Sequence, residues 1–156
     1  MSKFNIEEVK EYISNSSPNS KIYIGADSVR YVKKNIWYAE YTVAIVIHKE
    51  GRHGCKVFGK TTYEKDYDAK KDRPALRLMN EVYRASEMFL ELAEVIGDRH
   101  VEVHLDINPD IIHGSSCVVQ QAIGYIRGVC NVVPMVKPQA FAASCAADKF
   151  KGSYAA

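Results

Sequence analysis

The chain has 156 residues, of which 47% are hydrophobic and 26% are charged, and its formal net charge is +2 at pH 7. This length and composition are typical of one globular domain with a full hydrophobic core, and they exclude a disordered or fibrous chain. The small positive charge permits contact with nucleic acid but does not by itself indicate it. No apolar run is long enough to span a bilayer and the first residues are polar, so we expect a cytoplasmic protein without a signal peptide.

The four cysteines, Cys55, Cys117, Cys130 and Cys145, are scattered along the chain without the spacing of a zinc site. We interpret them as buried, reduced thiols of an intracellular protein.

The first half of the chain predicts a short helix followed by strands. Asn5 with Glu8 matches a capping box, which starts a helix over residues 5–15. Runs of β-branched and aromatic residues then predict three consecutive antiparallel strands. These strands are expected at 21–30, 36–49 and 55–63.

The second half alternates helices and strands. Residues 64–73 carry charges of both signs, and we interpret them as a solvated loop whose lysines and arginine could also touch phosphates. The remaining elements are expected to be a helix over 74–97, a strand over 100–106, a helix from Ser115 or Ser116, a strand over 131–136 and a helix over 139–151. One domain over 1–156 accounts for this order.

Asp27 is an acidic residue within the apolar strand Lys21–Arg30. A buried carboxylate loses its hydration, which costs several kcal/mol unless a cation or hydrogen bonds replace the water. Two interpretations stay open at this point. Asp27 either begins a turn after Gly25 or presents a metal ligand from the strand.

Glu81 lies about 60° from the centre of the apolar stripe predicted for helix 74–97, at a step of ~100° per residue. It is therefore the glutamate of this helix best placed to lean over a sheet edge. The alternative is a boundary residue that pairs with Arg77 or Arg84.

Two further acids follow along the chain. Asp106 ends the strand 100–106, at the position where ligand sites lie in α/β sheets. Val101, Val103 and Leu105 would face the core, whereas Glu102, His104 and Asp106 share the other face. We interpret His104 as a hydrogen-bonded structural residue near the site. Asp148 falls on the last predicted helix.

The order of the elements and the positions of these acids resemble the ribonuclease H-like superfamily. Within it, several phrases resemble the YkuK-type family of predicted ribonuclease H-related proteins. These phrases are Ile-Gly-Ala-Asp-Ser, Val-His-Leu-Asp-Ile-Asn, Gly-Tyr-Ile-Arg-Gly, Val-Lys-Pro and Ala-Ala-Asp-Lys. The resemblance implies an α/β fold with a five-stranded mixed sheet, its first three strands antiparallel, helices on both faces and an extra N-terminal helix.

The resemblance also implies that Asp27 and Asp106 lie on adjacent central strands, with Glu81 and Asp148 reaching in from helices. Four clustered carboxylates repel one another, so we expect them to bind two Mg²⁺ or Mn²⁺ ions. Two such ions, roughly 3.5–4 Å apart, can support phosphodiester hydrolysis. Asp27 would bridge both ions, with Asp106 and Glu81 on one side and Asp148 on the other.

Substrate contacts are expected beside these acids. Ser28 takes the place of the glycine in the superfamily's usual Asp-Gly-Ser, which displaces the hydroxyl. Lys137 and Lys149 flank the expected site and would contact phosphate, with ordinary surface lysines as the alternative.

The first functional hypothesis is a metal-dependent nuclease that acts on RNA, RNA–DNA hybrid or structured DNA. The second is a scaffold of the same fold that binds nucleic acid or protein with little catalysis. The third is an assembly role, in which Trp37, Tyr38 and Tyr41 on an exposed sheet edge form a homodimer.

Overall fold

The computed structural model describes residues 3–49, 54–66, 75–105, 116–136 and 142. The elements, in chain order, are α1 (Ile6–Ser14), β1 (Lys21–Lys33), β2 (Ile36–His48), β3 (Cys55–Lys65), α2 (Ala75–Ile96), β4 (His100–Leu105) and α3 (Ser116–Cys130). The helix predicted over 139–151 lies outside the described residues, apart from Ala142.

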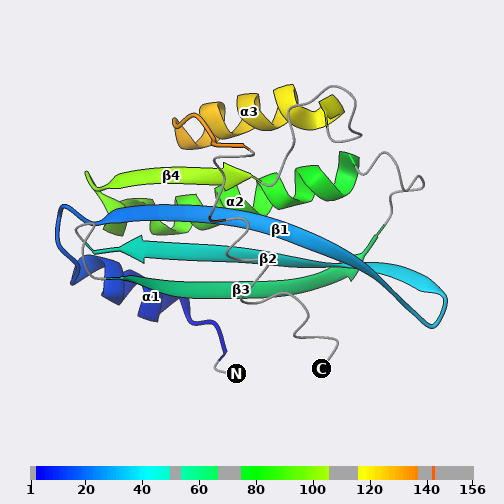
Figure 1. Ribbon diagram of the computed structural model, residues 1–156, viewed down its shortest axis with the longest axis horizontal. Helices are drawn as coiled ribbons and strands as arrows, with labels where there is room; N and C mark the ends of the chain where they lie inside the picture. Colours follow the sequence, from blue (N-terminus) through cyan, green and yellow to red (C-terminus); the bar gives the residue numbers. More distant parts are fainter. Residues whose placement is uncertain (1–2, 50–53, 67–74, 106–115, 137–141, 143–156) are drawn as a thin grey trace.

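The four strands form one mixed sheet in the order β3-β2-β1-β4 (Figure 1). The antiparallel pairing of β1 with β2 and of β2 with β3 confirms the predicted opening of the domain. β4 lies parallel to β1, which makes β1 a central strand.

The predicted fifth strand is reduced to one point of contact among the described residues. Met135 forms an isolated parallel bridge with His104. Its N–H donates to the Val103 carbonyl at 2.8 Å, and its carbonyl accepts from the Leu105 N–H at 2.9 Å. α3 continues to Cys130 and Asn131 adopts the left-handed conformation (φ 58°), so few described residues remain to extend along β4.

The first strand is longer than predicted, because it continues past Arg30 to Lys33. A two-residue loop then joins Lys33 to its partner Ile36. The loop residues Lys34 and Asn35 have φ of 51° and 64°, as in a type I′ turn, whose twist matches that of the flanking strands. The resulting hairpin projects beyond the rest of the sheet (Figure 1).

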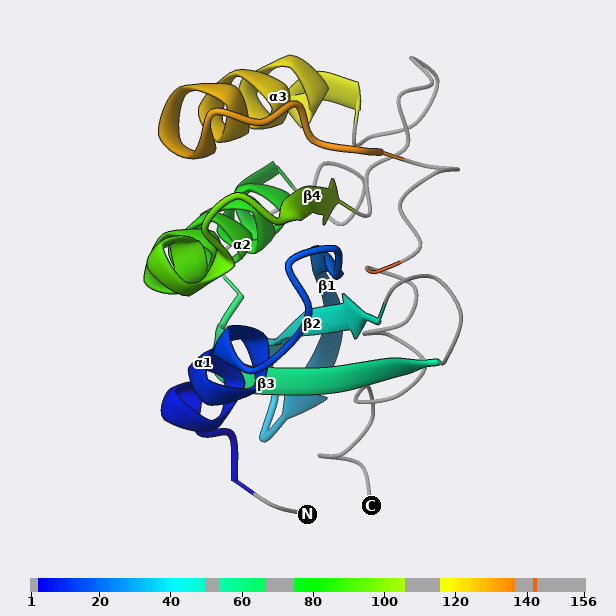
Figure 2. The same ribbon diagram turned by 90° about the vertical axis from the view of Figure 1, so that its left-hand side faces the viewer.

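One face of the sheet forms the hydrophobic core. Period-2 alternation places every second strand residue on this face, and the apolar ones are buried. They are Ile22, Ile24, Ala26, Val43, Ile45, Ile47, Val103 and Leu105. Figure 2 shows α1, α2 and α3 on the same side of the sheet. Among the described residues the helices thus cover one face, and the prediction of helices on both faces depends on residues beyond them.

The helical periodicity was predicted correctly. Asn5 caps α1, where its side chain accepts from the Glu7 N–H at 3.0 Å. The predicted stripe of α2 is buried or partly buried along its length: Leu78, Val82, Ala85, Phe89, Leu92 and Ile96. No helix among the described residues has the length and apolarity needed to cross a membrane.

The side chains of two cysteines, Cys55 and Cys130, are described, and they differ. Cys130 is buried in the core, and burial raises the pKa of its thiol to about 11. Cys55 is exposed at the start of β3, so the prediction of a buried thiol is wrong there, because the strand begins at the sheet edge. Both are free thiols.

Substitutions at a buried and at an exposed position of β1 should differ sharply in their effect on the free energy of unfolding. Ile24→Ala removes a fully buried side chain and should lower the free energy of unfolding by about 2–5 kcal/mol. Val32→Ala, at a side chain that is 55% exposed, should change it by less than about 0.5 kcal/mol. Urea unfolding of both variants measures this, and equal losses would contradict the burial of Ile24 in the core.

Candidate functional site

Asp27 lies in the middle of β1 and is 5% exposed. Its strand partner is Thr42 of β2, so the interpretation of Asp27 as the start of a turn is wrong. On its other side, β4 pairs with β1 only as far as the pair Ala26 and Leu105. Asp27 therefore occupies the first position of β1 beyond the described end of β4.

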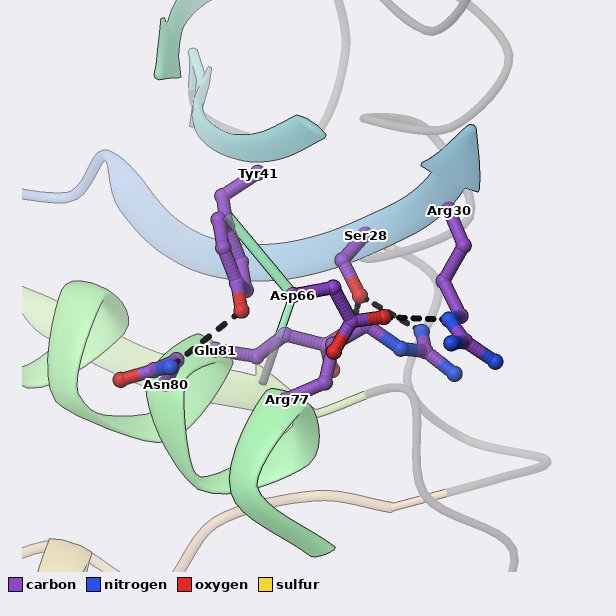
Figure 3. Close-up of polar contacts among 7 residues, drawn as sticks. All are labelled: Ser28, Arg30, Tyr41, Asp66, Arg77, Asn80 and Glu81. Carbon is purple, nitrogen blue, oxygen red and sulfur yellow. Dashed lines mark hydrogen bonds and ion pairs between the residues drawn. The ribbon is translucent and has the colours of Figure 1, made fainter. Parts of the chain in front are cut away.

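Ser28, the next residue, faces helix α2. Its hydroxyl donates to Glu81 Oε1 at 2.5 Å and accepts from Arg77 Nη1 at 2.8 Å (Figure 3). Glu81 is 2% exposed, which is far more buried than the predicted boundary position. The Arg77–Ser28–Glu81 chain gives this buried carboxylate a charge-assisted hydrogen bond.

Adjacent residues of a strand point to opposite faces of the sheet. Because Ser28 faces α2, the Asp27 side chain is directed to the other face. Glu40 of β2 shares that face, since its partner Val29 is two residues from Asp27 along β1. Glu40 is 2% exposed and was not singled out from the sequence, where it reads as one polar residue within the β2 run.

The described part of the sheet changes where β4 ends. β4 ends at Leu105, so beyond Ala26 no described strand flanks β1 on that side. Asp27 on one face and Ser28, which holds Glu81 on the other, both lie directly beyond this pairing. This is the carboxyl end of β4, where the sequence placed the site.

A second polar contact lies beside Ser28 (Figure 3). Arg30 Nε donates to Asp66 Oδ2, and the Asp66 side chain is 2% exposed. Glu64 and Lys65 belong to β3, and Arg84 pairs with Glu64 at 2.8 Å. Residues 64 and 65 are therefore strand and not the predicted loop, although both are exposed as predicted, whereas the Asp66 side chain is not solvated. Local sequence patterns do not report the Arg30–Asp66 contact, because the two residues lie 36 positions apart.

Tyr41 does not belong to an exposed aromatic edge. It is 2% exposed, its hydroxyl accepts from Asn80 Nδ2 at 3.3 Å, and the Arg84 guanidinium lies 4.4 Å from its ring centre. Trp37 is 38% exposed and contacts the Arg30 guanidinium at 4.7 Å. Tyr41 is therefore not part of the predicted exposed aromatic edge, because it falls on the face that α2 covers.

Four of the predicted site residues lie outside the described residues: Asp106, Lys137, Asp148 and Lys149. Within the part of the chain that the structure describes, no group of three or more histidine, cysteine or acidic residues could hold a metal ion. The four-carboxylate site therefore stays a prediction, of which Asp27 and Glu81 can be placed.

His104 is fully buried on the face that Asp27 shares. Its Nδ1 accepts from the Ala142 N–H at 3.0 Å, so its Nε2 carries the proton and donates to Glu102 Oε1 at 3.1 Å. Burial lowers the pKa of His104 below its ordinary value of 6.5, and Glu102 opposes this only in part. The prediction of a hydrogen-bonded structural histidine is confirmed.

Glu102 also accepts from His100 Nε2 at 2.6 Å. Burial alone would raise the pKa of Glu102, but its hydrogen bonds with His100 and His104 outweigh burial and lower the pKa. The Tyr23 ring lies 5.5 Å from the His104 ring, centre to centre. These contacts fix the end of β4 against β1, immediately before Asp106 in the chain.

Comparison with protein families decides the classification. The sequence model of a family described as ribonuclease H-like matches residues 5–151. The chain belongs to this ribonuclease H-like family. The match spans almost the whole chain and is consistent with the YkuK-type resemblance of its motifs. Searches of curated proteins and of solved structures give no match.

The ribonuclease H-like assignment agrees with the mixed sheet and with the pairing of β1 and β4. Membership gives the fold and the class of proteins, and it leaves the activity of this chain to its own residues.

The Ser28–Glu81 contact predicts a measurable loss of stability. Ser28→Ala removes a hydrogen bond to a buried charged group and should lower the free energy of unfolding by about 1.5–3 kcal/mol. Ser86→Ala is the matched control, because this buried serine donates to the neutral Tyr83 carbonyl at 2.8 Å and should cost only about 0.5–1.5 kcal/mol. Urea unfolding compares the two, and a loss at Ser28 no larger than at Ser86 would contradict the charged contact.

His104 predicts a pH dependence of stability. Because its pKa is lower when folded, the unfolded chain binds more protons once the pH falls below about 6.5. The contribution of neutral His104 to the free energy of unfolding is therefore complete above that pH. It is lost as the pH falls toward the pKa of His104 in the folded chain. In chemical unfolding, the free energy of unfolding should fall less between pH 7.5 and 5.5 for His104→Gln than for the wild type. Parallel pH profiles would refute the neutral buried imidazole.

Proposed function

We propose that this chain is a divalent-metal-dependent phosphodiester hydrolase, a nuclease that acts on RNA, RNA–DNA hybrid or structured DNA. The observation that carries the proposal is the position of Asp27, a buried carboxylate of a central strand at the described end of β4. Membership of the ribonuclease H-like family supports it. A protein that only bound a partner would gain nothing from placing a carboxylate there, since burying it is costly.

The residues present fit a hard cation. Asp27 and Glu81 both offer carboxylate oxygens, the donors that Mg²⁺ and Mn²⁺ prefer, and both are nearly removed from water. In this proposal Asp27, Glu81, Asp106 and Asp148 would hold two ions. When bound, such ions supply an activated water and stabilisation of the leaving oxygen.

The chain's own residues would position these groups. Ser28 and Arg77 hold Glu81 by the open edge of β1, and this fixes the carboxylate before any ion arrives. His104, which contacts the Tyr23 ring and the Ala142 N–H, anchors β4 directly before Asp106. Ser28, Lys137 and Lys149 are proposed to contact the substrate, the two lysines through phosphate oxygens.

Cleavage of a labelled substrate panel tests the proposal. The panel holds single-stranded RNA and DNA, duplexes, an RNA–DNA hybrid and a four-way junction, each in Mg²⁺, Mn²⁺ or EDTA. We expect metal-dependent cleavage of at least one substrate. Asp27→Asn should lower its rate by more than the roughly 10–100-fold typical of losing an outer-shell partner.

Asp98→Asn is the matched control, because this exposed aspartate follows α2 and the same chemical change should leave cleavage unaltered. Cleavage that persists in Asp27→Asn or in EDTA would refute the assigned site. Absence of cleavage across the panel, together with absence of metal binding, would leave a scaffold that binds its partner without catalysis.

A further inference from the structure

The hairpin of β1 and β2 carries an aromatic surface on the face that Asp27 shares. Tyr31 and its strand partner Tyr38 stack with ring centres 5.6 Å apart and planes 16° from parallel. Tyr63 of β3 meets Tyr31 edge-on at 6.3 Å and is 43% exposed. Together with Lys33 and Lys34 at the hairpin tip, these three residues are called here the tyrosine surface.

The register links this surface to Asp27. Residues two apart on a strand share a face, so Asp27, Val29, Tyr31 and Lys33 form one row along β1. Tyr31 is four residues from Asp27, or about 13 Å along the strand. A chain molecule lying on the lysines and tyrosines of this row would run along β1 in the direction of Asp27.

The charge of the hairpin favours a polyanion. Residues 31–38 contain two lysines and no acidic residue. A symmetric dimer through this surface would bring the lysines of two copies toward one another, which like charges oppose. Exposed aromatic rings beside positive charge are the combination that binds single-stranded nucleic acid, by base stacking and phosphate contact.

We propose that the tyrosine surface binds a single-stranded segment of nucleic acid and guides it toward Asp27. Bases stack on the exposed ring of Tyr63 and on the edge of the Tyr31–Tyr38 pair, while Lys33 and Lys34 contact phosphates. The guiding role rests on the proposed function, whereas the binding itself does not need cleavage.

Binding measured in EDTA separates the two proposals. Fluorescence anisotropy of labelled 12-nucleotide RNA and DNA single strands is followed with the full chain, and a blunt duplex serves as competitor. Tyr63→Ala should weaken single-strand binding by about 5- to 100-fold, the range expected for losing one stacked base. Tyr63→Phe keeps the ring and should bind like the wild type. Lys34→Gln should reduce the slope of log K against log salt by about 0.7.

Tyr125→Ala is the matched control, since Tyr125 is 37% exposed and contacts Tyr83 of α2 at 5.0 Å, in a tyrosine pair on the helices. This variant should bind like the wild type. Equal binding by Tyr63→Ala and the wild type would overturn the proposal, as would a duplex that competes as well as the unlabelled single strand.

Sedimentation tests the alternative that a second copy of this chain occupies the tyrosine surface. A wild-type dimer that Tyr63→Ala converts to monomer, with nucleic-acid binding unchanged, would assign the surface to a second copy and overturn the proposal. Loss of cleavage in Asp27→Asn with binding in EDTA retained would support both proposals. Binding that depends on Tyr63 without any cleavage would support the surface and count against the nuclease.

Discussion

The structure depends on β1, a central strand that must bury one face in the core while holding a carboxylate on the other. Ile22, Ile24 and Ala26 face the helices and are almost fully buried. Asp27 follows directly and is 5% exposed, although burying a charge is unfavourable without compensation. β2 pairs with β1 through and beyond Asp27, whereas β4 pairs with β1 as far as Ala26. The core stabilises the fold and thereby fixes the position of Asp27.

The candidate site lies where β4 ends beside β1. Up to Ala26 the backbone of β1 pairs on both sides, and beyond it the described sheet leaves one edge open. Glu81 is held near that edge by Ser28, and His104 links β4 to Tyr23 of β1 and to the Ala142 N–H. Past the edge, β1 continues into the hairpin that carries the tyrosine surface. One strand thus connects the core, the proposed metal ligand and the proposed binding surface.

Much of this arrangement was predictable from local patterns, because periods of 2 and 3.6 residues report directly on strand and helix faces. The core face of β4 and the stripe of α2 followed from such periods. The length of the hairpin did not, because a type I′ turn at Lys34-Asn35 lacks the usual glycine signal. The buried contacts of Ser28 with Glu81 and of Arg30 with Asp66 join residues 53 and 36 positions apart. Such pairs depend on tertiary packing, which periodicity does not encode.

Binding of Mn²⁺ is the direct test of a metal site at Asp27, because it requires no substrate. Electron paramagnetic resonance of free Mn²⁺ during titration counts the ions that the wild type and Asp27→Asn bind, with Asp98→Asn as the control. We expect two bound ions in the wild type and in Asp98→Asn, and loss of that binding in Asp27→Asn. Equal binding by all three proteins, or no binding by the wild type, would contradict a metal site at Asp27.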